Sequence, residues 1–342
     1  MKNNFDFIRL AYALMVIITH SYALLDIPET RDLLGWLSNG QMVLSYWAVR
    51  GFFCLSGYLI IQSLLRSNSL LSYVMKRVLR IFPAFLFLLL LTFCTTAYYY
   101  TDKNLAFSNK SVWRYLFENL TLRINYKIDH IFEKNNMSTI NGSLWTIPYE
   151  FYFYLFITPL FFIKKRNIHI STIILSISLL FAIDFIVPKN QFGSIPIIWL
   201  STNYCVSLGI YFLMGALLSF IKEWLIKNAN TLALVSIALT VMSFYFETIY
   251  ISKYFLIPLL TISFGYVHIP FLNNIGKHGD FSYGIYLFSF PVSQIILSFY
   301  PKISASSLSI TTIVFVFPIA FISWHLIEKK AIQLKYKILK KV

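Results

Sequence analysis

Long apolar runs separated by short polar connections dominate the chain. Ten runs are long enough to cross about 30 Å of hydrocarbon as helices. They cover residues 7–25, 40–65, 79–100, 145–163, 169–187, 200–221, 231–247, 250–267, 281–300 and 304–327. This pattern predicts an all-α, polytopic membrane protein with about ten transmembrane helices in one bundle. No internal repeat interrupts it, so residues 1–342 are expected to form a single membrane domain.

The composition agrees with this prediction. Hydrophobic residues make up 58% of the chain and charged residues 13%, whereas soluble domains are nearer one quarter charged. The net charge of +15 does not indicate a nucleic-acid partner, because the basic residues lie between apolar runs. Cys54, Cys94 and Cys205 are odd in number and lie in apolar surroundings. They are predicted to be small core residues, with neither a disulfide framework nor a metal site.

The distribution of Lys and Arg predicts the orientation. If the N-terminus is cytoplasmic, the basic stretches "VMKRVLR" and "KKRN" fall on the inner side and both termini are cytoplasmic. The opening "MKNNFDFIRL" leads straight into the first span, so no cleavable signal is expected. Residues 101–143 are then an extracytoplasmic loop, and residues 328–342 a basic cytoplasmic tail.

The first span carries two ionisable groups, Arg9 and His20. Ionisable residues inside a membrane are expensive and are functional candidates by default. The two lie 11 residues apart, almost three helical turns, so they share one face and are separated by about 16 Å along the axis. This face is expected to present a cation near one membrane surface and an imidazole deeper inside.

Glu150 lies in the fourth apolar run, "NGSLWTIPYEFYFYLF". Helix rise places His20 about 20 Å above the inner end of its span and Glu150 about 7–8 Å below the outer end. These depths coincide, which predicts a carboxylate facing an imidazole and orienting its ring. The alternative is that Glu150 pairs with another polar group and serves packing.

Arg77 and Arg80 lie three residues apart on one face near Pro83. Arginine forks suit phosphates; the alternative is that they only anchor the topology. Arg50, in "YWAVRGFF", needs a partner or a water-lined cavity. Ser56 and Gly57 form a small pair that lets helices approach closely.

Seven motifs together resemble the acyltransferase family 3 membrane proteins, which modify bacterial surface glycans with acetyl or other short acyl groups. In chain order they are "FDFIRLAYALMVIITHS", "AVRGFFCLSGYLI", "RVLRIFPAF", "GSLWTIPYEFYFYL", "YFLMGALL", "GKHGDFSYGIYLFSFPV" and "HLIEKKA". Each motif alone is weak, but seven in the expected order are specific. Two positions depart from the pattern. Ser289 stands where the family often has histidine, and Lys330 where it often has proline.

The resemblance implies an integral enzyme of the bacterial plasma (inner) membrane. It would move an acyl group, in the first instance acetyl, from cytoplasmic acyl-CoA to a hydroxyl of a cell-surface or lipid-linked saccharide. No bound cofactor is implied, because acyl-CoA is a donor substrate. Arg9, Arg77 and Arg80 would bind the nucleotide. His20 would act as general base oriented by Glu150, or would carry the acyl group itself.

The same motifs supply residues expected to line the substrate pocket or support the fold. These are Ser56, Trp145, Ser282, Tyr283 and Tyr286. A transporter or flippase of a surface-glycan pathway is the alternative function, since ten spans with buried charges suit one. It would show inverted repeats with broken helices, which the sequence lacks. A structural or sensor protein would not need Arg9 and His20 on one face.

Overall fold

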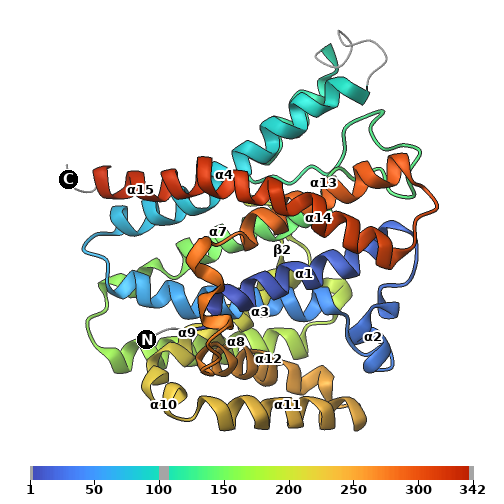
Figure 1. Cartoon of the computed structure of the whole chain (residues 1–342). Helices are drawn as coiled ribbons and strands as arrows, with labels where there is room; N and C mark the ends of the chain where they lie inside the picture. The colour runs from blue at the N-terminus through green and yellow to red at the C-terminus, as the bar shows by residue number, and fades with distance from the viewer. Residues whose placement is uncertain (1–2, 100–107, 339–342) are drawn as a thin grey trace.

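The computed structural model describes residues 3–99 and 108–338. Most of the helices run roughly along one direction (Figure 1), and both ends of the chain lie at the same end of the bundle, opposite α2. The helices are α1 Phe5–Leu24, α2 Leu33–Leu37, α3 Leu44–Leu65, α4 Leu70–Tyr99, α6 Lys110–Leu120, α7 Thr146–Phe156, α8 Arg166–Ile186, α9 Thr202–Leu218, α10 Lys222–Lys227, α11 Ala229–Tyr245, α12 Ile249–Tyr266, α13 Ser282–Phe299, α14 Ala305–Ser323 and α15 Lys329–Ile338. Two short antiparallel strands, β1 Ser194–Ile195 and β2 Leu200–Ser201, precede α9.

The all-α membrane fold is confirmed. Within the described residues, eight helical stretches are long and apolar enough to cross a membrane. The predicted run 231–247 forms α11, an apolar helix of 17 residues. Nine of the ten predicted runs therefore correspond to long apolar helices.

The fourth run, 145–163, is helical but is not one continuous α-helix. It forms a 3-10 turn at Gly142–Trp145, the 11-residue helix α7, and a second 3-10 turn at Thr158–Phe162. Pro159 stands at the start of the second turn, and a proline disfavours helical conformation in the residue before it. At 1.5 Å per residue, α7 is only about 16 Å long and cannot cross the bilayer alone.

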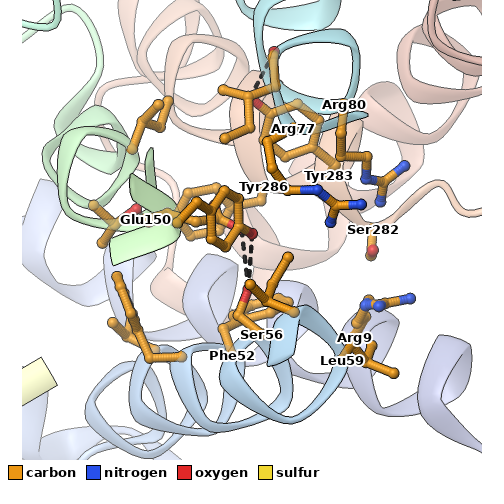
Figure 2. A pocket seen from close by; sticks show the side chains of 17 residues that line it. Arg9, Phe52, Ser56, Leu59, Arg77, Arg80, Glu150, Ser282, Tyr283 and Tyr286 are labelled. Carbon is orange, nitrogen blue, oxygen red and sulfur yellow. Dashed lines mark hydrogen bonds between the residues drawn. The ribbon is translucent and has the colours of Figure 1, made fainter. Parts of the chain in front are cut away.

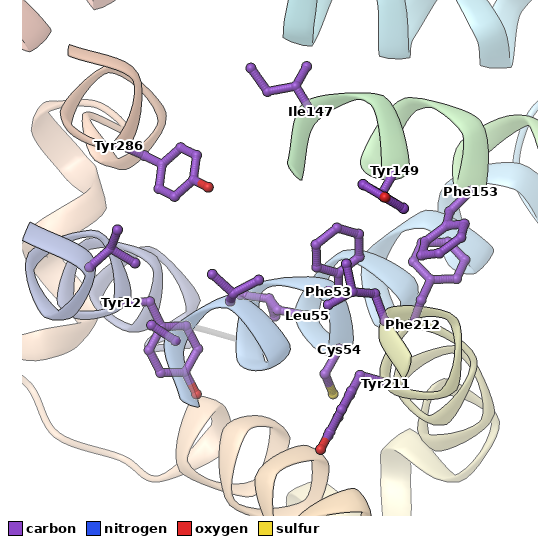
Figure 3. Close-up of a cluster of buried hydrophobic side chains, with 14 of the residues drawn as sticks. Tyr12, Phe53, Cys54, Leu55, Ile147, Tyr149, Phe153, Tyr211, Phe212 and Tyr286 are labelled. Carbon is purple, nitrogen blue, oxygen red and sulfur yellow. The ribbon is translucent and has the colours of Figure 1, made fainter. Parts of the chain in front are cut away.

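Helix α3 lies at the centre of the bundle and packs against α1, α9 and α12. A Cβ atom on Gly57 would lie 1.8 Å from the carbonyl oxygen of Phe212, and one on Gly215 would lie 1.9 Å from that of Cys54. The α3 and α9 backbones therefore touch, as the small pair at Ser56–Gly57 predicted. Tyr286 and Tyr211 lie on different sides of α3 (Figure 3).

The segment before α7 is tied to α13 by hydrogen bonds. Gln294 is fully buried and its side-chain amide donates to the carbonyls of Met137 (2.8 Å) and Thr139 (2.6 Å). Asn141 donates to the carbonyl of Leu287 at 2.8 Å. Residues 137–141 of the predicted loop 101–143 are thus tied to the bundle; residues 101–107 lie outside the described residues.

The predicted basic tail does not begin as a free segment. Glu328 closes a π turn at Trp324–Glu328 and is 1% exposed. The chain then continues as α15, which packs against α4 and contains Lys330 in its first turn. Residues 339–342 of the predicted tail lie outside the described residues.

Candidate active site

A cavity opens between α1, α3, α4, α7 and α13 (Figure 2). Eight of the ten residues singled out from the sequence line it: Arg9, Ser56, Arg77, Arg80, Glu150, Ser282, Tyr283 and Tyr286. The guanidinium groups of the arginines gather at one end, and Glu150 and Tyr286 lie farther along. Five helices that are distant in sequence thus bring the predicted polar groups to one place. His20 and Trp145 are the two predicted residues that do not line the cavity.

Asp280 joins two of the three arginines. Its Oδ2 accepts a hydrogen bond from Arg80 and lies 3.5 Å from Nη1 of Arg9. Its Oδ1 accepts from the hydroxyl of Ser282. Arg9 also contacts Asp6 at 3.0 Å, and Arg80 lies 3.9 Å from Glu328. These contacts tie α1, α4 and the end of α14 to the start of α13.

Asp280 lies in the connection before α13, outside the membrane-spanning helices. Burial alone would raise the pKa of this carboxyl group. The neighbouring charges of Arg80 and Arg9 outweigh that effect and hold the pKa of Asp280 at about 2. The carboxylate is therefore ionised and fixes the positions of both arginines.

Arg77 differs from the other two arginines because it makes no ion pair within the part of the chain that the structure describes. Its Nη2 donates weakly to Ser63 at 3.4 Å, and its Nε is buried without a hydrogen-bond partner. The guanidinium carbon lies 5.9 Å from the ring centroid of Tyr73 and 5.8 Å from that of Tyr154. Arg77 therefore retains hydrogen-bonding capacity that faces the cavity.

Glu150 is held by two hydroxyl groups. Its Oε1 accepts hydrogen bonds from Ser56 at 3.2 Å and from Tyr154, and these two hydroxyls are 2.8 Å apart (Figure 2). Tyr154 follows Glu150 by four residues, so helical spacing in "YEFYFYL" could have identified it.

His20 and Glu150, which the sequence predicted to face each other, share no hydrogen bond. Nδ1 of His20 is buried and has no hydrogen-bond partner, and the ring packs edge-on against Phe290 with centroids 5.3 Å apart. Helix α7, which carries Glu150, packs against α3, α4 and α9, whereas α1, which carries His20, packs against α3, α13 and α14. The equal depth predicted from the sequence did not make these helices neighbours.

Helix α13 nevertheless links His20 to the cavity. Tyr286 lines the cavity, and Phe290, which contacts His20, follows it by one helical turn on the same face. The hydroxyl of Tyr286 donates to the carbonyl of Ser143 at 2.9 Å and lies 2.7 Å from that of Thr146. Phe290, the residue that contacts His20, therefore lies about one turn of α13, roughly 6 Å, beyond Tyr286.

The remaining motif residues make contacts between helices or within one helix. Tyr283 donates to the carbonyl of Ile81 at 3.0 Å, which holds α13 to α4.

Trp145 lies outside the cavity, with its ring 4.6 Å from that of Tyr204 and 5.8 Å from that of Tyr149. The hydroxyl of Ser289, at the position where histidine is common, donates to the carbonyl of Tyr286 within its own helix.

Asp280, Tyr154 and Glu328 are site residues that sequence reasoning missed. Asp280 and Glu328 lie inside quoted motifs, "GKHGDFSYGIYLFSFPV" and "HLIEKKA", but nothing in their spacing shows that they meet Arg80. Among residues 3–99 and 108–338, no three His, Cys, Asp or Glu side chains could hold a metal ion together. All three cysteines are free thiols, but only Cys54 is a buried core residue as predicted; Cys94 is exposed and Cys205 is half-buried.

A bundle of apolar helices around a cavity lined by arginines, a carboxylate and tyrosines defines a polytopic membrane protein with a polar site inside it. Residues 2–328 match the family described as the acyltransferase domain, and the chain belongs to this family. It is 30% identical to the O-acetyl transferase of Shigella phage Sf6, in an alignment that covers 96% of each chain. It is also 28% identical to nodulation protein 10 of Rhizobium leguminosarum bv. viciae, over 48% of this chain and 46% of that protein. No solved structure matches the chain.

These matches identify the chain as a multi-pass membrane O-acyltransferase, an enzyme that transfers groups other than aminoacyl groups. They favour the enzyme over the transporter or flippase and over the sensor.

Proposed function

We propose that this enzyme transfers an acyl group, in the first instance acetyl, from cytoplasmic acyl-CoA to a hydroxyl of a cell-surface or lipid-linked saccharide. It would act in a bacterial inner membrane with both termini in the cytoplasm. The similarity to a phage O-acetyl transferase supports the acetyl group. The observation that carries the proposal is the cavity that joins Arg77 to Glu150 between five helices.

The arginine end of this cavity would receive the anionic part of the donor. Arg9 lies in the first turns of α1, near the end of the bundle where both termini lie (Figure 1). Arg77 has unused donors, and a guanidinium fork matches the oxygens of a phosphate. Asp280 would keep Arg9 and Arg80 in place while Arg77 makes the strongest new contact.

The acyl end would extend along the cavity toward Tyr286 and His20. There His20 would accept the proton of the acceptor hydroxyl while the oxygen of that hydroxyl attacks the thioester carbonyl. The carbon–sulfur bond then breaks, and the CoA thiolate leaves and takes up a proton. Alternatively, His20 would take the acyl group first and pass it to the hydroxyl. Glu150 would act on the reacting groups across the cavity, held in place by Ser56 and Tyr154.

Donor binding provides the direct test. Acetyl-CoA titrated into purified protein should bind the Arg77→Ala variant about tenfold or more weakly, since a charge-assisted hydrogen bond contributes about 1.5–3 kcal/mol. Arg66→Ala is the matched control, because Arg66 is an exposed arginine at the same end of the bundle. Equal affinity of the wild type and the Arg77→Ala variant would overturn the donor site.

A further inference from the structure

A second basic cluster lies outside the cavity, between α3 and α12. It consists of Arg50 and Tyr46 of α3 and Lys253 of α12. Arg50 is only 8% exposed, and its guanidinium carbon lies 3.5 Å from the ring centroid of Tyr46. Nζ of Lys253 lies 5.0 Å from the same centroid and 5.3 Å from that of Tyr254. Two cations from different helices thus share one aromatic ring.

No acid compensates these two charges. Within the described residues, neither Arg50 nor Lys253 makes an ion pair, and Nε of Arg50 is buried without a hydrogen-bond partner. Asp184 contacts the hydroxyl of Tyr254 but is already engaged by Lys189. A buried cation needs a partner or a water-filled cavity. Stacking on a ring leaves the N–H donors of the guanidinium group unused.

The position of the cluster indicates where a partner comes from. Arg50 is six residues from the start of α3, about 9 Å, and Lys253 is four residues from the start of α12, about 6 Å. Both helices begin at the end of the bundle opposite the termini, as α1 and α3 are joined there through α2 (Figure 1). Tyr46 and Lys253 are half-buried, so the cluster is accessible from one side.

We infer that Arg50 and Lys253, with Tyr46 between them, bind a phosphate group that enters from this end of the bundle. Phosphate oxygens match the fork of Arg50, and the ammonium of Lys253 supplies a second positive charge. Two uncompensated cations suit a group that carries one or two negative charges. The depth of a few ångströms to about 9 Å below the helix ends suits the headgroup phosphate of a membrane amphiphile. A free phosphate ion has the same chemistry.

Lipid titration of the purified full-length protein in neutral maltoside micelles tests this inference. The melting temperature is followed while phosphatidylglycerol, phosphatidylcholine or inorganic phosphate is added. The variants are Arg50→Gln, Lys253→Gln and the matched control Arg31→Gln, which removes an exposed cation at the same end of the bundle. We expect phosphatidylglycerol to raise the melting temperature of the wild type and of Arg31→Gln. The apparent affinity should fall about tenfold or more in the other two variants.

The other outcomes are equally informative. Stabilisation by inorganic phosphate that both cluster variants lose would support the site and identify a free anion as its ligand. Equal responses of all four proteins, or no response to either phosphate probe, would overturn the inference. If Arg50→Gln does not fold, the lipid affinities of Lys253→Gln and Arg50→Lys test the inference instead. Arg50→Lys keeps the positive charge but loses the planar guanidinium fork. Unchanged lipid affinity in both of these variants would also overturn it.

Discussion

The two basic clusters, one in the cavity and one between α3 and α12, differ in how their buried charges are compensated. In the cavity, Arg9 and Arg80 share the carboxylate of Asp280, and Glu328 lies 3.9 Å from Arg80. In the cluster at the opposite end, Arg50 stacks on Tyr46, and no acid among residues 3–99 and 108–338 pairs with it. A fixed counter-ion holds a guanidinium group in one place, whereas a guanidinium group without a counter-ion can still bind an anionic ligand. Arg77 lies in the cavity, but like Arg50 it has no counter-ion within the described residues.

Because the reaction is proposed to take place at the cavity, substitutions at the cavity should affect catalysis more than substitutions in the Arg50 cluster. The largest effect should come from His20→Ala, because a general base contributes about 10²–10⁴-fold to the rate. Acyl transfer measured in proteoliposomes should fall by that factor, while membrane insertion and melting temperature change little. A His20→Ala variant with near-normal turnover would remove His20 from the reaction.

Asp280→Asn should be the most destabilising change in either cluster. It leaves Arg9 and Arg80 without their shared counter-ion, and breaking a buried ion pair typically costs about 3–5 kcal/mol. The free energy of unfolding, measured by denaturant titration in micelles, should fall by about that amount. Donor affinity should fall as well, because both arginines lose their fixed positions. Stability within about 0.5 kcal/mol of the wild type would show that the pair does not organise the site.

The pH dependence of stability should reflect the same pair. The pKa of Asp280 is about 2 in the folded protein, below the usual carboxyl value of about 4. A depressed pKa means that the stabilisation is complete above about pH 4 and is lost as the pH falls through about 2. Acid denaturation of Asp280→Asn should therefore lack the corresponding loss, whereas Asp6→Asn, which removes the neighbouring acid of Arg9, should retain it.

Arg77→Lys should separate charge from geometry. Lysine keeps the positive charge but loses the planar fork, so donor affinity should be restored only partly relative to Arg77→Ala. Titration with acetyl-CoA measures the difference: Arg77→Lys should bind more weakly than the wild type but more tightly than Arg77→Ala. Full restoration by lysine would mean that only the charge matters at this position.

The smallest effect on stability should come from Arg50→Gln. It breaks no ion pair, and a cation–π contact of this kind contributes about 0.5–2 kcal/mol. In the absence of added lipid, its free energy of unfolding should therefore fall by less than that of Asp280→Asn. A larger loss for Arg50→Gln would abolish the distinction between the two clusters.

The sequence by itself was sufficient for the parts of the structure that depend on local patterns. Apolar run length identified the spans because lipid requires backbone groups to be satisfied within each helix. Helical spacing placed Arg9 and His20 on one face of α1. The motifs identified eight residues that line the cavity. Each of these inferences needs only the period of a helix, the thickness of a bilayer or a motif order.

Only the tertiary structure decided which helices meet. Depth suggested that Glu150 faces His20, but α7 is a short helix packed on α3 and α4, and its carboxylate binds Ser56 and Tyr154. Asp280 lies in the connection before α13, and nothing in the local sequence showed that it pairs with arginines from α1 and α4. The physical reason is that helical period and hydropathy specify each helix separately. Neighbours are chosen by close contacts between helices, such as Gly57 against the backbone of Phe212, which no single segment contains.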